Sequence, residues 1–115
     1  MGKEYPQLKN EFQACKGLIT AIGDETRQNI IIALFEGSCE GMRVGEITAK
    51  THLSRPAVSH HLKILCDAKI LSVRHDGTKN YYFFNPDESQ VKKMAQLFGH
   101  IAELIQQYSN HKEVK

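Results

Sequence analysis

The segment over residues 53–65, LSRPAVSHHLKIL, alternates apolar and polar positions with the period of an α-helix. Val58, Leu62 and Leu65 fall at i, i+4 and i+7, so they form a stripe on one helical face. This stripe must pack against the rest of the protein, which leaves the polar positions facing elsewhere. Those polar positions are Arg55, Ser59, His60 and Lys63. The pattern predicts a helix with one buried face and one basic, hydrogen-bonding face.

The residues in front of this segment predict a second, shorter helix and a turn. Ser54 is suited to cap the main helix, and Pro56 is tolerated in a first helical turn, where its missing N–H costs no hydrogen bond. A brief helix is predicted from Glu46 to about His52, and the letters HLS form the turn between the two. Two helices joined in this way are typical of a helix-turn-helix, here over about residues 46–67.

Narrow apolar seams are predicted in helices near both ends of the chain, over about residues 7–22 and 86–109. Their apolar residues recur at alternating steps of 3 and 4, the spacing of helices that pack along one line. Asn85 as N-cap and Pro86 at the first helical position mark the start of the second of these helices. Two such seams are more apolar surface than one subunit buries, so we expect a homodimer. The expected interface residues are Leu8, Phe12, Cys15, Ile19, Met94, Phe98, Ile101 and Ile105.

A β-hairpin is predicted between the helix-turn-helix and the last helix. Apolar and aromatic residues flank Asp76-Gly77, a dipeptide typical of tight turns between antiparallel strands. The expected strands are Ile70–His75 and Lys79–Phe84, which form a wing over about residues 70–84.

A strongly apolar helix is predicted before the helix-turn-helix. Asp24 is its expected N-cap, and the helix runs to Phe35 before Gly37 ends it. Residues 42–44 (MRV) follow in a loop rich in small residues and are expected to pair as a short edge strand.

The composition is that of an ordinary globular protein, with 115 residues, 41% hydrophobic and 24% charged, and a net charge of +2. We expect a single domain over residues 1–115. There is no signal peptide, and no apolar run approaches the roughly 20 residues that cross a bilayer, so a cytoplasmic protein is expected. The mild positive charge permits nucleic-acid binding, and the positions of the charges matter more than their sum.

The predicted fold is mainly α with a small β-hairpin, a winged helix-turn-helix with an additional dimerisation helix at each end. On this fold the second helix of the helix-turn-helix presents its N-terminal half to the major groove of DNA. Arg55 can donate two hydrogen bonds to O6 and N7 of guanine, while Ser59 and His60 can contact base edges or phosphates. Lys63 and three wing residues are expected to contact the DNA backbone. The wing residues are Arg74, His75 and Lys79.

Three stretches of the sequence resemble the ArsR/SmtB family of bacterial and archaeal transcriptional repressors. They are AIGDETRQNIIIALFEG, VGEITAKTHLSRPAVSHHLKILCDAKIL and VRHDGTKNYYFFN, and the similarity spans about residues 18–108. The resemblance implies a homodimer that binds a palindromic operator and releases it when an effector binds. It places the base-contacting positions on Arg55, Pro56, Ser59 and His60. Pro56 departs from the family pattern because its side chain has no donor, so any contact there is apolar.

Metal-sensing members of that family carry their ligands in two places, and neither is matched here. Thiolate sensors carry Cys-Val-Cys in the third helix, where residues 43–45 of this chain are Arg-Val-Gly. Zinc sensors use the last helix, and Asp87, His100 and Glu103 approach that spacing one residue out of register. Three carboxylate-rich ligands would hold zinc weakly, so we predict no metal or other cofactor. Asp87 is expected to stabilise a helix N-terminus and His100 to form a solvated i, i+3 pair with Glu103.

The three cysteines are far apart and form no C-x-x-C pair. Cys15 and Cys66 lie in apolar patterns and are expected to be small buried side chains. Cys39 lies in a polar, glycine-rich loop and is expected to be exposed and reactive, so a redox role for Cys39 is a further hypothesis.

No nucleophile with a neighbouring base, phosphate loop or carboxylate pair is recognisable, so we expect no enzymatic activity. A winged helix can also bind other proteins without contacting DNA, because a fold does not fix a function. Basic residues on both the second helix and the wing favour DNA. The predicted function is a homodimeric, sequence-specific transcriptional regulator, expected to be a repressor. A zinc-responsive repressor and a protein-interaction module are the alternatives.

Overall fold

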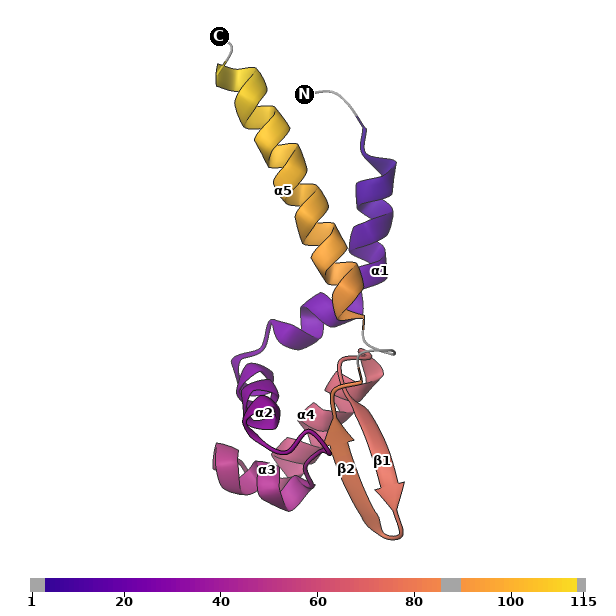
Figure 1. Ribbon diagram of the computed structural model, residues 1–115, viewed down its shortest axis with the longest axis vertical. Helices are drawn as coiled ribbons and strands as arrows, with labels where there is room; N and C mark the ends of the chain where they lie inside the picture. Colours follow the sequence, from indigo (N-terminus) through magenta and orange to yellow (C-terminus); the bar gives the residue numbers. More distant parts are fainter. Residues whose placement is uncertain (1–3, 86–89, 114–115) are drawn as a thin grey trace.

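A computed structural model describes residues 4–85 and 90–113, with side chains up to residue 110. This part of the chain forms five helices and one hairpin, which are, in order, α1 (Pro6–Ile22), α2 (Glu25–Glu36), α3 (Val44–Thr51), α4 (Arg55–Asp67), β1 (Ser72–Asp76), β2 (Lys79–Phe83) and α5 (Val91–Glu113). Figure 1 shows α2, α3, α4 and the hairpin at one end of an elongated molecule, from which α1 and α5 extend together. The predicted fold class, a mainly α winged helix-turn-helix with added terminal helices, is confirmed.

The packing of α4 against α2 and α3 forms the centre of the core. Val58, Leu62 and Leu65 are fully buried, as their spacing predicts. They belong to the same cluster as Ile30 of α2 and Ile47 of α3, which are also fully buried. Each such side chain contributes about 1.5–3 kcal/mol when it is removed from water. This contact therefore fixes the rotation of α4 about its own axis.

The predicted N-cap residues of α2 and α4 form side-chain hydrogen bonds to the first turn of their helices. Oδ2 of Asp24 accepts a hydrogen bond from the Arg27 N–H at 3.0 Å, and Oγ of Ser54 accepts one from the Ala57 N–H at 3.3 Å. The bond from Arg27 stabilises the carboxylate and holds the pKa of Asp24 below its usual value. Both caps satisfy N–H groups that have no partner inside the helix.

The third helix begins two residues earlier than its predicted start at Glu46. The reason is that Glu46 occupies the third helical position, where its Oε1 accepts a hydrogen bond from the Arg43 N–H at 3.0 Å. The helix ends where His52 adopts a left-handed backbone conformation, with φ of 60°. The His52 N–H still donates to the Thr48 carbonyl at 2.9 Å, which closes the last turn.

The hairpin has a two-residue turn. Asp76 pairs with Lys79, so Gly77 and Thr78 form the loop between the strands. Gly77 has a φ of +64°, a conformation that tight hairpin turns require at the first loop position and that glycine adopts without steric cost.

The predicted edge strand over residues 42–44 is reduced to a single bridge. Met42 and Tyr82 exchange two backbone hydrogen bonds, each of 2.9 Å, but the pairing stops there because Arg43 is already the N-cap of α3. Ile70 and Phe84, the outer ends of the predicted strands, also lie outside β1 and β2. The bridge nevertheless connects the start of α3 to the wing.

The two terminal helices pack against each other and against the core. Cys15 and Leu18 of α1 and Met94 and Leu97 of α5 are buried in one cluster. Leu97 is fully buried although it is absent from the predicted seam. The predicted start of α5 at residue 86 lies outside the described residues.

The expected interface residues fall into two groups. Those covered or partly covered within the chain are Leu8, Cys15, Ile19, Met94 and Ile101, and those exposed are Phe12, Phe98 and Ile105. α5 therefore has two neighbouring apolar faces, of which α1 covers one. No helix in the described ranges is long and apolar enough to cross a membrane.

Replacing Leu97 by Ala is expected to lower the free energy of unfolding by about 2–5 kcal/mol, because the change leaves a cavity between α1 and α5. Urea denaturation at one fixed protein concentration measures this loss. Gln96→Ala truncates an exposed neighbour and serves as the control, with an expected change within about 0.5 kcal/mol. Equal losses in the two variants would contradict the assignment of Leu97 to the core.

Candidate nucleic-acid interface

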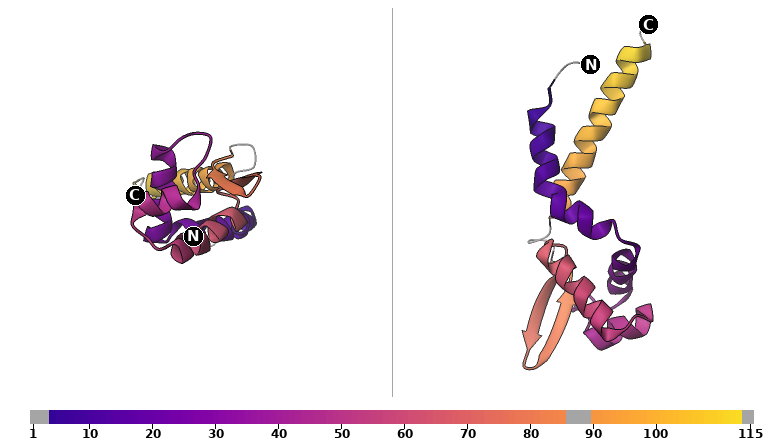
Figure 2. Two further views of the ribbon diagram at one scale, coloured as in Figure 1. Left: turned by 90° about the horizontal axis from the view of Figure 1, so that it is seen from below. Right: turned by 180° about the vertical axis from the view of Figure 1, so that it is seen from behind.

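The exposed face of α4 lies at the surface of the molecule, between α3 and the wing. Figure 2 shows, in the view from behind, α4 running between the hairpin and α3. The five residues of α4 predicted to contact DNA are all exposed, and they are Arg55, Pro56, Ser59, His60 and Lys63. Four of them come from the first two turns of the helix, and three of these four carry hydrogen-bonding side chains, so such groups gather at its start.

The two adjacent histidines of α4 have different surroundings. His60 is exposed, whereas His61 is partly buried and its Nδ1 lies 3.2 Å from Nη1 of Arg27. The same guanidinium donates hydrogen bonds to the carbonyl oxygens of Ala21 at 2.6 Å and Thr20 at 3.3 Å, near the end of α1. His61 therefore helps to hold α4 against α2, while His60 faces solvent. Arg27, which connects α1, α2 and α4, is absent from the sequence-based site.

Lys63 has an acidic neighbour one helical turn away. Its Nζ lies 3.1 Å from Oδ2 of Asp67, and both side chains are largely exposed. An exposed pair of this kind contributes only about 0–1 kcal/mol, so the ammonium group can exchange Asp67 for another anion at little cost.

The hairpin presents two different faces, because successive residues of a strand point to opposite sides. One face carries the cross-strand pairs Val73–Tyr82 and His75–Asn80, and the other carries Arg74–Tyr81 and Asp76–Lys79. Tyr82 packs against the core, so its face is the inner one. Arg74 and Lys79 therefore belong to the outer face of the wing.

Arg74 is held on that outer face by two contacts. Its Nη2 donates a hydrogen bond to the carbonyl oxygen of Glu40 at 3.3 Å, and its guanidinium lies 4.5 Å from the centre of the Tyr81 ring. These contacts attach the wing to the loop between α2 and α3. Arg74 would have to leave both partners to reach a phosphate.

The tip of the wing carries the two other predicted DNA contacts. Nδ1 of His75 lies 2.6 Å from Oδ1 of Asn80, so these two side chains fix each other across the strands. Lys79 is exposed and forms no ion pair with any residue that the structure describes. Its charge is therefore available to an external anion.

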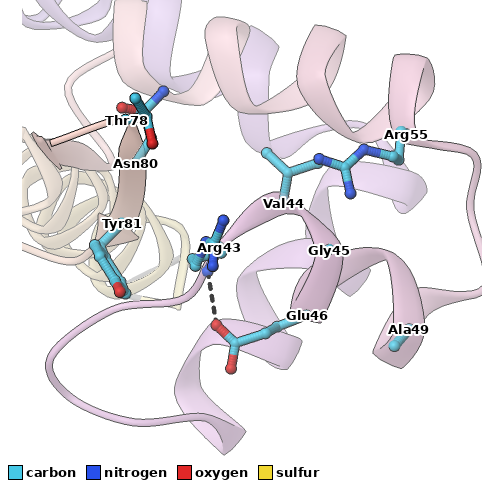
Figure 3. Close-up of a pocket in the computed structure, with 9 residues that line it drawn as sticks. All are labelled: Arg43, Val44, Gly45, Glu46, Ala49, Arg55, Thr78, Asn80 and Tyr81. Atoms are coloured by element: carbon cyan, nitrogen blue, oxygen red, sulfur yellow. Dashed lines mark hydrogen bonds between the residues drawn. The ribbon is translucent and has the colours of Figure 1, made fainter. Parts of the chain in front are cut away.

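A groove of about 820 Å³ separates the start of α4 from the wing (Figure 3). The first turn of α3 forms its floor, with Arg55 on one side and Asn80 and Tyr81 on the other. The guanidinium of Arg55 lies over Gly45, where a Cβ atom would be only 3.3 Å from Nη1. The missing side chain at Gly45 thus leaves room for Arg55 to lie along the groove.

Arg43 lies in the same groove and, like Arg27, is absent from the sequence-based site. Figure 3 shows it between Arg55 and the wing residues. A sequence signal exists, because Arg43 is a basic residue directly before a predicted helix. Its place in the groove depends on wing residues that are distant in sequence, since Thr78, Asn80 and Tyr81 follow Arg43 by 35 residues or more.

His100, a candidate metal residue of α5, is paired with α1 instead of with its expected neighbour on the same helix. Nδ1 of His100 lies 2.5 Å from Oε1 of Glu11 on α1, and only about a quarter of each side chain is exposed (25% and 24%). This corrects the expected solvated pair of His100 with Glu103, which is exposed. Asp87 lies outside the described residues, and within the described ranges no three His, Cys, Asp or Glu side chains gather to hold a metal ion.

The predicted exposures hold for Cys15 and Cys39, whereas Cys66 is less buried than expected. Cys15 is buried, Cys66 is partly buried and Cys39 is exposed in the loop after α2, and all three are free thiols. Burial raises the pKa of the Cys66 thiol, which disfavours the thiolate, the reactive form of cysteine.

The same region of the chain matches a known family. The family model described as bacterial regulatory protein, arsR family, matches residues 24–73, from the N-cap of α2 into β1. This segment includes the whole helix-turn-helix.

Three proteins of known sequence are similar over longer or overlapping segments. An uncharacterized HTH-type transcriptional regulator of Methanocaldococcus jannaschii, MJ1325, is 33% identical over 87 residues, which are 76% of this chain and 93% of that protein. The transcriptional repressor SdpR of Bacillus subtilis is 38% identical over 65 residues, or 56% of this chain and 69% of that protein. The HTH-type transcriptional regulator Rv2034 of Mycobacterium tuberculosis is 39% identical over 66 residues, which are 57% of this chain and only 59% of that protein.

Solved structures show the same fold. NolR from Sinorhizobium fredii superposes with a TM-score of 0.64 at 27% identity, over 90% of this chain and 96% of that one. The homodimeric winged helix-turn-helix DNA-binding domain from Mycobacterium bovis superposes with a TM-score of 0.62 at 19% identity, over 87% and 91%. With its family match, its relatives and its exposed α4, the chain belongs to the arsR family of bacterial regulatory proteins, as a DNA-binding transcriptional regulator.

Proposed function

We propose that the protein is a homodimeric repressor that binds a palindromic operator, with α4 in the major groove and the wing beside it. The observation that carries this proposal is the arrangement of α4, whose apolar stripe is fully buried while its hydrogen-bonding residues are exposed at one end. Repression follows the similar repressor of Bacillus subtilis. Such a protein acts by binding and not by catalysis, in the cytoplasm, where its DNA lies.

The residues of the interface divide between bases and backbone. Arg55 donates to guanine, Ser59 and His60 contact base edges or phosphates, and Pro56 offers only an apolar contact. The backbone contacts come from Lys63, Lys79, His75 and, once released from Glu40, Arg74. Base contacts determine which sequence is bound, and backbone contacts determine how strongly salt weakens binding.

The shape of a single chain supports the homodimer. Its radius of gyration is 18.1 Å, whereas a compact domain of this length has about 13 Å. α1 and α5 extend from the core, and an apolar cleft of about 240 Å³ lies between them, beside Leu8 and Leu104. Phe98 and Ile105 remain exposed on α5. We propose that a second copy of the chain covers these side chains, as the homodimeric state of the Mycobacterium bovis domain supports.

Arg55→Ala is expected to weaken operator binding by about 1–3 kcal/mol and to relax the preference at one base pair, because a bidentate contact to guanine is lost. Lys79→Ala should weaken binding by one common factor on all sequences and flatten the salt dependence. Fluorescence anisotropy measures both, with the DNA upstream of the protein's own gene and a random duplex, at several salt concentrations. Equal effects of the two variants on both duplexes would contradict these roles, and a parent protein that binds neither duplex would overturn the function.

Phe98→Ser is expected to raise the dissociation constant of the dimer by about 30-fold or more, because a buried aromatic anchor contributes about 2 kcal/mol or more to an interface. Analytical ultracentrifugation over a range of concentrations measures the shift. Phe35→Ser is the matched control, since Phe35 is more exposed (72% against 53%) but lies on α2. Ile105→Ser replaces Phe98→Ser if the latter does not fold. Unchanged self-association in the α5 variants would refute the proposed interface.

A further inference from the structure

The groove between α4 and the wing lies where a DNA backbone strand would pass if both elements contact DNA. The major and minor grooves of B-DNA are separated by a sugar-phosphate strand. If α4 occupies the major groove and the wing reaches past that strand, as the proposed function requires, the strand must cross the protein surface between them. In this protein that surface is the groove of about 820 Å³.

The charges that line the groove favour an anion. Arg43 and Arg55 contribute two guanidinium groups, and Glu46 is the one acidic residue among the described side chains that line it. The Arg43 guanidinium is exposed and forms no ion pair within the described part of the chain. Thr78 and Asn80 add hydrogen-bonding groups from the wing. Together they present the cations and polar groups that proteins use to bind phosphate and sugar oxygens.

The backbone of Arg43 is fixed from both sides. Its N–H donates to Oε1 of Glu46 at 3.0 Å, and its carbonyl oxygen accepts hydrogen bonds from the N–H groups of Glu46 at 3.0 Å and Ile47 at 3.1 Å. The preceding residue, Met42, is bonded twice to Tyr82 of β2. Arg43 is therefore anchored where the helix-turn-helix meets the wing, so only its side chain has to be ordered on binding.

We propose that Arg43 is a further phosphate-binding residue of the DNA interface, and that the groove it lines with Arg55 and Asn80 holds one backbone strand of the operator. Arg74, the arginine that the sequence pattern favours for this role, lies on the outer face of the wing and is bound to Glu40 and Tyr81. Arg74 does not line the groove, and Arg43 supplies a charge there instead. This inference rests on the proposed function.

The test compares salt dependence and sequence preference. Arg43→Gln should make the plot of log Kobs against log salt shallower by about 0.9 for each lost phosphate contact, or about 2 for a dimer. The ratio of operator to random-DNA affinity should stay unchanged, since a phosphate contact carries no base preference. Lys16→Gln, which removes one charge from an exposed position on α1, is the control and should leave the slope at its parent value.

Glu46→Gln provides a test with the opposite sign. Glutamine can still accept the hydrogen bond from Arg43, but the carboxylate that repels phosphate is gone, so binding to both duplexes should tighten. Circular dichroism confirms that each variant is folded. If Arg43→Gln does not fold, tighter binding by Glu46→Gln supports the inference and unchanged binding overturns it.

The outcomes separate this inference from the proposed function. If Arg43→Gln shows the same slope of log Kobs against log salt as the parent protein, and the parent protein binds the operator, the inference is overturned and the proposed function stands. A changed operator-to-random ratio in Arg43→Gln would also overturn it, because Arg43 would then contact a base. Failure of the parent protein to bind either duplex would remove the function on which the inference depends.

Discussion

The burial of one face of α4 is the constraint on which the rest of the structure depends. Val58, Leu62 and Leu65 are removed from water by α2 and α3, and this contact sets the rotation of the helix. Because neighbouring residues of a helix point about 100° apart, a shift of one position would turn the basic face into the core. The same contact that stabilises the domain therefore directs Arg55 and His60 outward.

The elements that depend on local signals could be predicted from the sequence. The apolar period predicts the buried face of α4, Asp24 and Ser54 are suited to cap their helices, and Gly77 permits the tight hairpin turn. The start of α3 is misplaced by two residues because a glutamate can either begin a helix or cap it from the third position. That choice depends on the bridge between Met42 and β2, which local patterning does not contain.

The packing of the terminal helices and the lining of the groove could not be predicted from the sequence, because they depend on contacts between distant segments. α5 carries two overlapping apolar seams with the same alternation of 3 and 4, one through Leu97 and one through Phe98, and the sequence favours either equally. Only the contact with α1 shows that Leu97 is buried and Phe98 exposed. Likewise Arg74 and Arg43 are both basic residues near the wing, and only the folded structure shows that Arg43 lines the groove while Arg74 is bound to Glu40 and Tyr81 instead.

The contacts of Arg27 restrict which substitutions this position can accept during evolution. Its guanidinium donates hydrogen bonds to two carbonyl oxygens near the end of α1 and contacts His61 on α4. Lysine would keep the charge but has one nitrogen in place of a planar fork, so it could not make the same three contacts. The exposed side chains of α4 that we propose to face DNA can vary as operators diverge, because they are not part of the buried core. We therefore expect descendants of this gene to retain Arg27 even where their target sequences have become different.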